Sequence, residues 1–149
     1  MKKEAIIQYV RELDWRYPAD VQQNAVRALT QTDDQYLHMI LDKHQKATWE
    51  NAVQVIGKIG YPRNAPLLSD LIWLLQDVNW PGADKALEIL SSLDKKFLMP
   101  LIEEALCTAE ADHDTMWIGG INLLVKKARI QMKDFHDDKM SDILKKADF

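Results

Sequence analysis

The segment TWENAVQVIGKIG, residues 48–60, predicts an amphipathic helix with a recognisable start and end. Its apolar residues recur three and four positions apart, which is the spacing of one helix face. Thr48 is a suitable N-cap, and Gly60 supplies the left-handed residue at which many helices end. We therefore expect a helix between these two residues with one face buried.

The same apolar spacing continues from this segment toward both ends of the chain, and no stretch alternates at period two. It predicts a protein made only of helices, in which proline and asparagine or aspartate mark the helix starts. Eight further helices are expected: residues 5–14, from Pro18, from Asp33 or Asp34 to His44, from Asn64 to Leu75, from Asn79-Trp80-Pro81, from Asp94 with Pro100 in its first turn, after Asp114, and residues 135–144.

Parts of the chain repeat one another. Residues 24–29 (NAVRAL) and 51–56 (NAVQVI) are similar, and three tryptophans stand 31 and 37 residues apart, each followed three positions later by a small residue. A small residue there allows a neighbouring helix to approach closely. A two-helix unit of about 30–40 residues is typical of helical arrays. We expect an all-α, HEAT- or armadillo-like α-solenoid of about four stacked antiparallel helix pairs plus an N-terminal helix. The tryptophan and small-residue pairs are Trp49 and Ala52, Trp80 and Ala83, and Trp117 and Gly120.

The central third of the chain, from Tyr61 to Ala83, resembles a family of short bacterial proteins of unknown function. The resemblance rests on a leucine-rich helix followed by an Asp-x-Asn-Trp-Pro signature, here Asp77-Val78-Asn79-Trp80-Pro81. It implies HEAT-like repeats. The family has no established catalytic residues, so the resemblance implies no activity.

Composition places the chain among ordinary globular domains, with 47% hydrophobic and 28% charged residues. Its 149 residues fit a single domain, 1–149. We expect a cytoplasmic protein, because one cysteine, Cys107, cannot form an internal disulfide and no apolar run is long enough for a signal or a membrane span. We also expect a monomer or a weak dimer. No Lys or Arg lies between Lys96 and Lys126, which disfavours nucleic acid and favours a basic partner.

Two groups of residues are candidates for partner binding. Around the central turn, Trp73, Asp77 and Trp80 could anchor a partner, because tryptophan is enriched at interface hot spots, or they could simply pack two helix layers together. The acidic stretch of Glu103, Glu104, Asp112 and Asp114 could engage a basic partner, or it could be the solvated face of one helix and its loop.

Other reactive residues suggest no site. His113 and His136 have acidic neighbours but lack a second His or Cys at ligand spacing, so we expect no metal. His38 and His44 are six residues apart, which would place them on different faces of a helix. Cys107 is expected to be buried and inert, since its acidic neighbours would disfavour a thiolate.

These features predict a non-enzymatic module, without a cofactor, that binds an unidentified protein partner through a helical-repeat groove. No phosphate-binding loop or hydrolase motif is present. One alternative is an immunity protein that neutralises a cognate bacterial toxin. A second is a HEAT-like nucleic-acid enzyme of the DNA glycosylase kind, which the scattered lysines and the excess of acidic residues disfavour.

Overall fold

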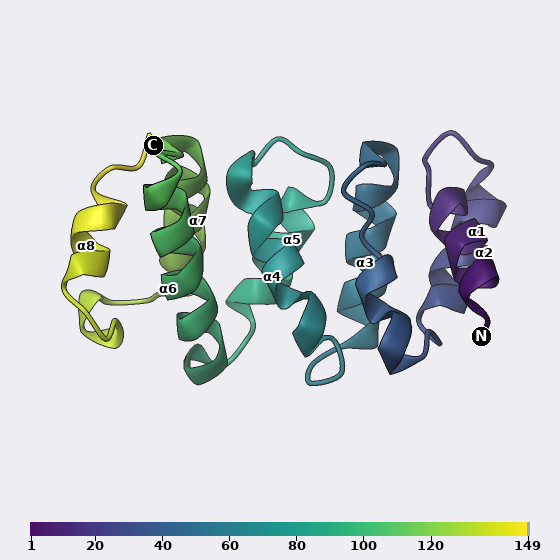
Figure 1. Cartoon of the computed structure of the whole chain (residues 1–149), viewed down its shortest axis with the longest axis horizontal. Coiled ribbons are helices and arrows are strands. Elements are labelled where there is room, and N and C mark those ends of the chain that lie inside the picture. Colours follow the sequence, from purple (N-terminus) through teal and green to yellow (C-terminus); the bar gives the residue numbers. More distant parts are fainter. Residues whose placement is uncertain (149) are drawn as a thin grey trace. The chain divides into compact units, whose positions relative to one another are not determined.

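The computed structural model describes residues 1–148, and these residues form α-helices and 3₁₀ helices with no β-strand. The expected all-α class is therefore confirmed. The chain divides into two compact units, Met1–Asp70 and Leu71–Phe149. Figure 1 shows the order of the helices along the chain. The expectation of a single domain stays a prediction.

The first unit contains three α-helices of two to three turns, α1 (Lys3–Glu12), α2 (Ala19–Leu29) and α3 (Trp49–Ile59). The helix α1 packs against α2, and α2 packs against α3. The predicted start and end of α3 are confirmed, because Thr48 is its N-cap residue and Gly60 follows it with φ +76°. The Thr48 hydroxyl, however, donates to the Gln45 carbonyl oxygen instead of capping the helix (2.6 Å).

The segment between α2 and α3 differs from the expected third helix. Residues 34–39 form a 3₁₀ helix, η1 (Asp34–Met39), and a second short one, η2 (Lys46–Thr48), precedes α3. Residues 40–45 between them form bends and turns. The Asp42 side chain accounts for part of this, because its two carboxylate oxygens accept from the His44 backbone N–H (2.9 Å) and the Gln45 side-chain amide (2.6 Å). Such local bonds compete with helix formation.

The leucine-rich helix after Asn64 is interrupted. It consists of η3 (Ala65–Leu67), α4 (Leu68–Trp73) and η4 (Leu74–Gln76), and α4 runs across the boundary between the two units. Asn64 is buried and stands at the N-cap position, but its side chain donates to the Ile56 carbonyl oxygen in α3 (3.0 Å). The asparagine therefore links two helices of the first unit and does not cap the one that follows it.

The second unit contains α5 (Ala83–Ser91), α6 (Lys95–Ala111), α7 (Thr115–Lys127), η5 (Met132–Asp134) and α8 (Lys139–Leu144). The helices α6 and α7 run side by side, α5 packs against α7, and α8 packs against both α6 and α7 (Figure 1). Asp94 and Asp114 cap α6 and α7 by accepting backbone N–H groups of Lys96 and Trp117. Both of these aspartates were expected near helix starts.

The expected start of α6 after Asp94 is confirmed, but the expected start of α5 and the expected place of Pro100 in the first turn of α6 are wrong. The helix α5 begins at Ala83 after Gly82, whose left-handed conformation (φ +87°) separates Trp80-Pro81 from the helix. Pro100 lies in the interior of α6, at its sixth residue, and not in the first turn. Proline has no backbone N–H and removes one helical hydrogen bond.

The apolar faces predicted from the sequence are buried. The core residues of α3 include Ala52, Val53 and Ile56, and those of the leucine-rich helix include Leu67, Leu71, Leu74 and Leu75, all at most 2% exposed. Among residues 1–148, none of the helices has the length and apolar character needed to cross a bilayer.

Candidate functional site

The central-turn residues lie together but are partly buried. The rings of Trp73 and Trp80 are in contact, with centroids 5.2 Å apart and planes inclined by 36°. The Asp77 carboxylate accepts the Asn79 backbone N–H (2.8 Å), which stabilises the turn that follows η4. Because each tryptophan covers part of the other, this pair contributes to packing and offers less free aromatic surface than the sequence suggested.

The acidic residues divide into two kinds. The Glu103 carboxylate accepts the His136 backbone N–H (3.0 Å) and lies 3.2 Å from His136 Nδ1, and Asp114 caps α7. These two carboxylates therefore hold the second unit together. Glu104 and Asp112 are exposed, and within residues 1–148 their carboxylates have no hydrogen-bonding or ionic partner. They remain available to a basic partner.

A third surface, which the sequence did not single out, lies in the first unit at residues 13–18, here named the Trp15 loop. Trp15 is 54% exposed and Tyr17 is 40% exposed, while the Arg16 side chain is 77% exposed. Tryptophan, tyrosine and arginine are the residue types most enriched at interface hot spots. The loop joins α1 to α2, so its position is determined by two packed helices.

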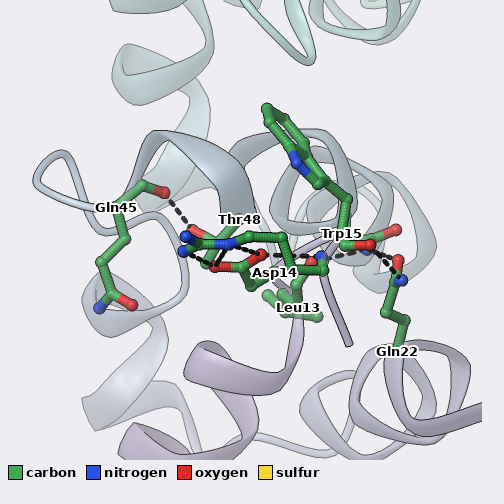
Figure 2. A network of polar contacts seen from close by, with 8 residues as sticks. Leu13, Asp14, Trp15, Gln22, Gln45 and Thr48 are labelled. Carbon is green, nitrogen blue, oxygen red and sulfur yellow. Dashed lines mark hydrogen bonds and ion pairs between the residues drawn. The ribbon is translucent and has the colours of Figure 1, made fainter. Parts of the chain in front are cut away.

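The backbone of the Trp15 loop is held by side chains from α2 and α3. The Asn51 amide donates to the Leu13 carbonyl oxygen (2.7 Å) and to the Gln22 side-chain oxygen (2.9 Å). The Gln22 amide in turn donates to the carbonyl oxygens of Trp15 (3.1 Å) and Tyr17 (2.7 Å). Figure 2 shows that the Trp15 indole points away from these bonds. The backbone is thus fixed while the aromatic side chain stays exposed.

Asp14 fixes the arginine of the same loop. Its carboxylate accepts the Arg16 backbone N–H (2.9 Å) and two nitrogens of the Arg16 guanidinium, Nε (2.9 Å) and Nη2 (2.5 Å). The hydrogen bonds from Arg16 lower the pKa of Asp14 despite the opposing effect of burial, and the carboxylate raises the pKa of Arg16 in return. The guanidinium is therefore held in one orientation beside a buried carboxylate.

A hollow of about 650 Å³ lies beside this ion pair, and we name it the Arg16 hollow. Two of its lining residues are arginines and one is an acid, so the lining carries a permanent net charge of +1 (two Arg minus Asp14). In the part of the chain that the structure describes, the Arg11 guanidinium and Nη1 of Arg16 have no hydrogen-bond partner. The lining residues are Arg11, Asp14, Arg16, Tyr17, Pro18 and Gln45.

A second hollow of about 550 Å³ in the same unit brings two histidines together. His38 and His44 both line it, contrary to the expectation that they lie on different faces of a helix, because residues 40–45 are not helical. Asp70 also lines it, 3.6 Å from Lys43 Nζ. Burial raises the pKa of Asp70, while Lys43 opposes this effect. No group of three or more potential metal ligands exists among the described residues.

Cys107 is exposed, so the expectation of a buried thiol is wrong. It lies in α6 between Leu106, which is fully buried, and Thr108, which is exposed. The apolar neighbours in the sequence suggested burial, but the buried face of α6 is formed by other positions, among them Ile102, Ala105 and Ala109.

The sequence contained a partial signal for the Trp15 loop. Trp15, Arg16 and Tyr17 interrupt the apolar spacing just before Pro18, so they had to lie between helices. Their fixed backbone was not predictable, because it depends on Asn51, which lies 38 residues after Leu13. The family resemblance adds no residue to this loop and stays a prediction. No family model, curated protein or solved structure matches the chain.

Proposed function

We propose that this chain is a non-enzymatic protein-binding module of the HEAT-like solenoid kind, and that the Trp15 loop is its principal contact. The solenoid arrangement and the resemblance to the bacterial family are part of this proposal. One observation carries it: Trp15, Arg16 and Tyr17 are exposed on a backbone that Asn51, Gln22 and Asp14 hold in place.

A fixed backbone favours binding because little conformational entropy is lost when the partner arrives. An exposed indole that is already positioned can enter a partner's pocket, and the surrounding polar groups can exclude water. Shape complementarity would then provide the affinity, with no chemical step.

The test compares Trp15→Ala with Phe97→Ala in capture experiments from the native organism. Both variants truncate an aromatic ring of similar exposure (54% and 40%), and Phe97 lies in α6 of the second unit. A partner that is identified by mass spectrometry and then purified should bind Trp15→Ala at least tenfold more weakly, a loss of about 1.4 kcal/mol, and bind Phe97→Ala as it binds the unchanged chain. Equal binding by the two variants contradicts the proposal.

The exposed carboxylates of Glu104 and Asp112 favour a second candidate, an immunity protein with a basic toxin as its partner. Charge reversal by Glu104→Lys and Asp112→Lys would then weaken capture of that toxin and reduce the salt dependence of binding, while Trp15→Ala would not. Salt-dependent binding of duplex DNA by the unchanged chain would instead support the nucleic-acid alternative.

A further inference from the structure

The Arg16 hollow has the chemistry of a site for a carboxylate. Its lining contains two guanidinium groups and the phenol of Tyr17, so hydrogen-bond donors predominate. The single acid, Asp14, has both oxygens occupied by Arg16, and its charge is therefore already compensated. An incoming carboxylate would therefore meet mainly hydrogen-bond donors.

The arginines are suited to hold such a group. One side of the Arg16 guanidinium is bound to Asp14 through Nε and Nη2, which leaves Nη1 for another acceptor. Arg11, in the last turn of α1, supplies a second guanidinium that has no partner among residues 1–148. Arginine pairs with carboxylates through short, charge-assisted hydrogen bonds, and an orientation fixed in advance reduces the entropy lost on binding.

The place of the hollow suggests where the carboxylate comes from. Arg16 and Tyr17 line it, and they directly follow Trp15 on the same loop. A polypeptide segment that covers the Trp15 ring would therefore run close to the hollow. Pro18 and the Tyr17 ring give the hollow an apolar wall, which suits the methylene groups of an acidic side chain.

We infer that the Arg16 hollow binds an aspartate or glutamate side chain of the partner protein, next to an apolar residue that contacts Trp15. This inference rests on the proposed function and specifies the partner's contact segment as acidic and apolar. It concerns a different surface from Glu104 and Asp112, which would attract a basic partner.

The test uses a naive library of displayed 12-residue peptides selected on the full chain. Peptides that are enriched should contain Asp or Glu near an aromatic or aliphatic residue. By calorimetry they should bind Arg11→Glu at least tenfold more weakly than they bind Arg27→Glu. Arg27 is a matched control, because it is also an exposed arginine in the last turn of its helix, α2.

A charge exchange separates a direct contact from a general effect of the mutation. Replacing the acidic residue of an enriched peptide by lysine should abolish binding to the unchanged chain and restore binding to Arg11→Glu. Peptides that need Trp15 but bind Arg11→Glu unchanged would overturn the carboxylate site and leave the proposed function standing. Enriched peptides whose affinity is unchanged by substitutions of Trp15 and of Arg11 would contradict both the carboxylate site and the proposed function. The absence of any enriched peptide would contradict both as well. Selection of phosphorylated or basic peptides in preference to acidic ones would overturn the inference.

Discussion

Asn51 donates a hydrogen bond of 2.7 Å from its side-chain amide to the carbonyl oxygen of Leu13, and so joins α3 to the end of α1. The same nitrogen also reaches the Gln22 side chain in α2 (2.9 Å). Leu13 is fully buried, so its carbonyl group has little access to water as an alternative partner. One amide therefore links three helices, and it bonds to the same Gln22 side chain that donates to the Trp15 carbonyl oxygen.

Replacing Asn51 by alanine should lower the free energy of unfolding by about 1–3 kcal/mol, because a carbonyl group in a buried position loses its donor. Asn24→Ala is the matched control, since Asn24 opens the similar segment in α2 but is exposed, and its effect should stay within about 0.5 kcal/mol. Urea denaturation of both variants measures the difference. Equal free energies of unfolding for Asn51→Ala and Asn24→Ala would show that the hydrogen bonds of Asn51 make no net contribution to stability.

Gly120 should not tolerate a side chain. A Cβ atom at this position would lie 2.0 Å from the Leu75 carbonyl oxygen, so α7 and η4 would have to separate. Gly120→Ala should lower the free energy of unfolding by about 1–3 kcal/mol or prevent folding.

Gly57→Ala is the control for Gly120→Ala, and we expect it to change the free energy of unfolding in the opposite direction. Gly57 is exposed within α3, and alanine there should raise stability by up to about 1 kcal/mol, because it restricts the unfolded chain and favours the helix. Thermal unfolding followed by circular dichroism distinguishes the two substitutions. A stable Gly120→Ala protein would mean that the close approach of α7 to η4 is wrong.

Trp117 and Trp15 should differ in what they contribute to stability. The Trp117 indole is buried, and its Nε1 donates to the Ile72 carbonyl oxygen (3.1 Å). Trp117→Phe keeps an aromatic ring but removes the donor, and we expect a loss of about 1–3 kcal/mol. Trp15→Phe should change the free energy of unfolding by less than about 0.5 kcal/mol. Denaturant titrations of the two variants check this, and a comparable loss at Trp15 would show that its ring is needed for packing.

Asp14 should make the stability of the chain sensitive to acid. Its pKa is lowered in the folded protein, chiefly by the Arg16 side chain, so the ionised carboxylate stabilises the fold above its ordinary pKa of 3.8. This contribution is lost as the pH falls through the lower, folded pKa. The unfolding free energy of the unchanged chain should therefore decrease more steeply between pH 5 and pH 2 than that of Asp14→Asn.

The control for Asp14 is Asp20→Asn, which alters an exposed aspartate at the start of α2. It should keep the acid dependence of the unchanged chain. Denaturant unfolding at half-unit pH intervals gives both profiles. An Asp14→Asn profile parallel to that of the unchanged chain would mean that the Asp14–Arg16 pair does not contribute to folding.

The sequence by itself determined the helical class and the approximate limits of α1, α2, α3 and α7. This information is local, since apolar spacing and capping residues act within a few turns of one helix. The sequence also predicted that a neighbouring helix approaches α7 closely at Gly120, because this small residue lies three positions after Trp117. The structure places the Leu75 backbone against Gly120.

Only the tertiary structure decided the details that matter for binding. Residues 34–45 contain apolar residues at helical spacing, yet they form a 3₁₀ helix and bends in which Asp42 bonds to its neighbours. The sequence pointed to Trp73 and Trp80 as binding candidates, but these two rings cover one another, Trp117 is buried, and Trp15 is the exposed one among these four tryptophans. The reason is that burial and hydrogen bonding depend on which distant segments meet. Asn51 and Leu13 meet across 38 residues, a relationship that no periodicity within one helix contains.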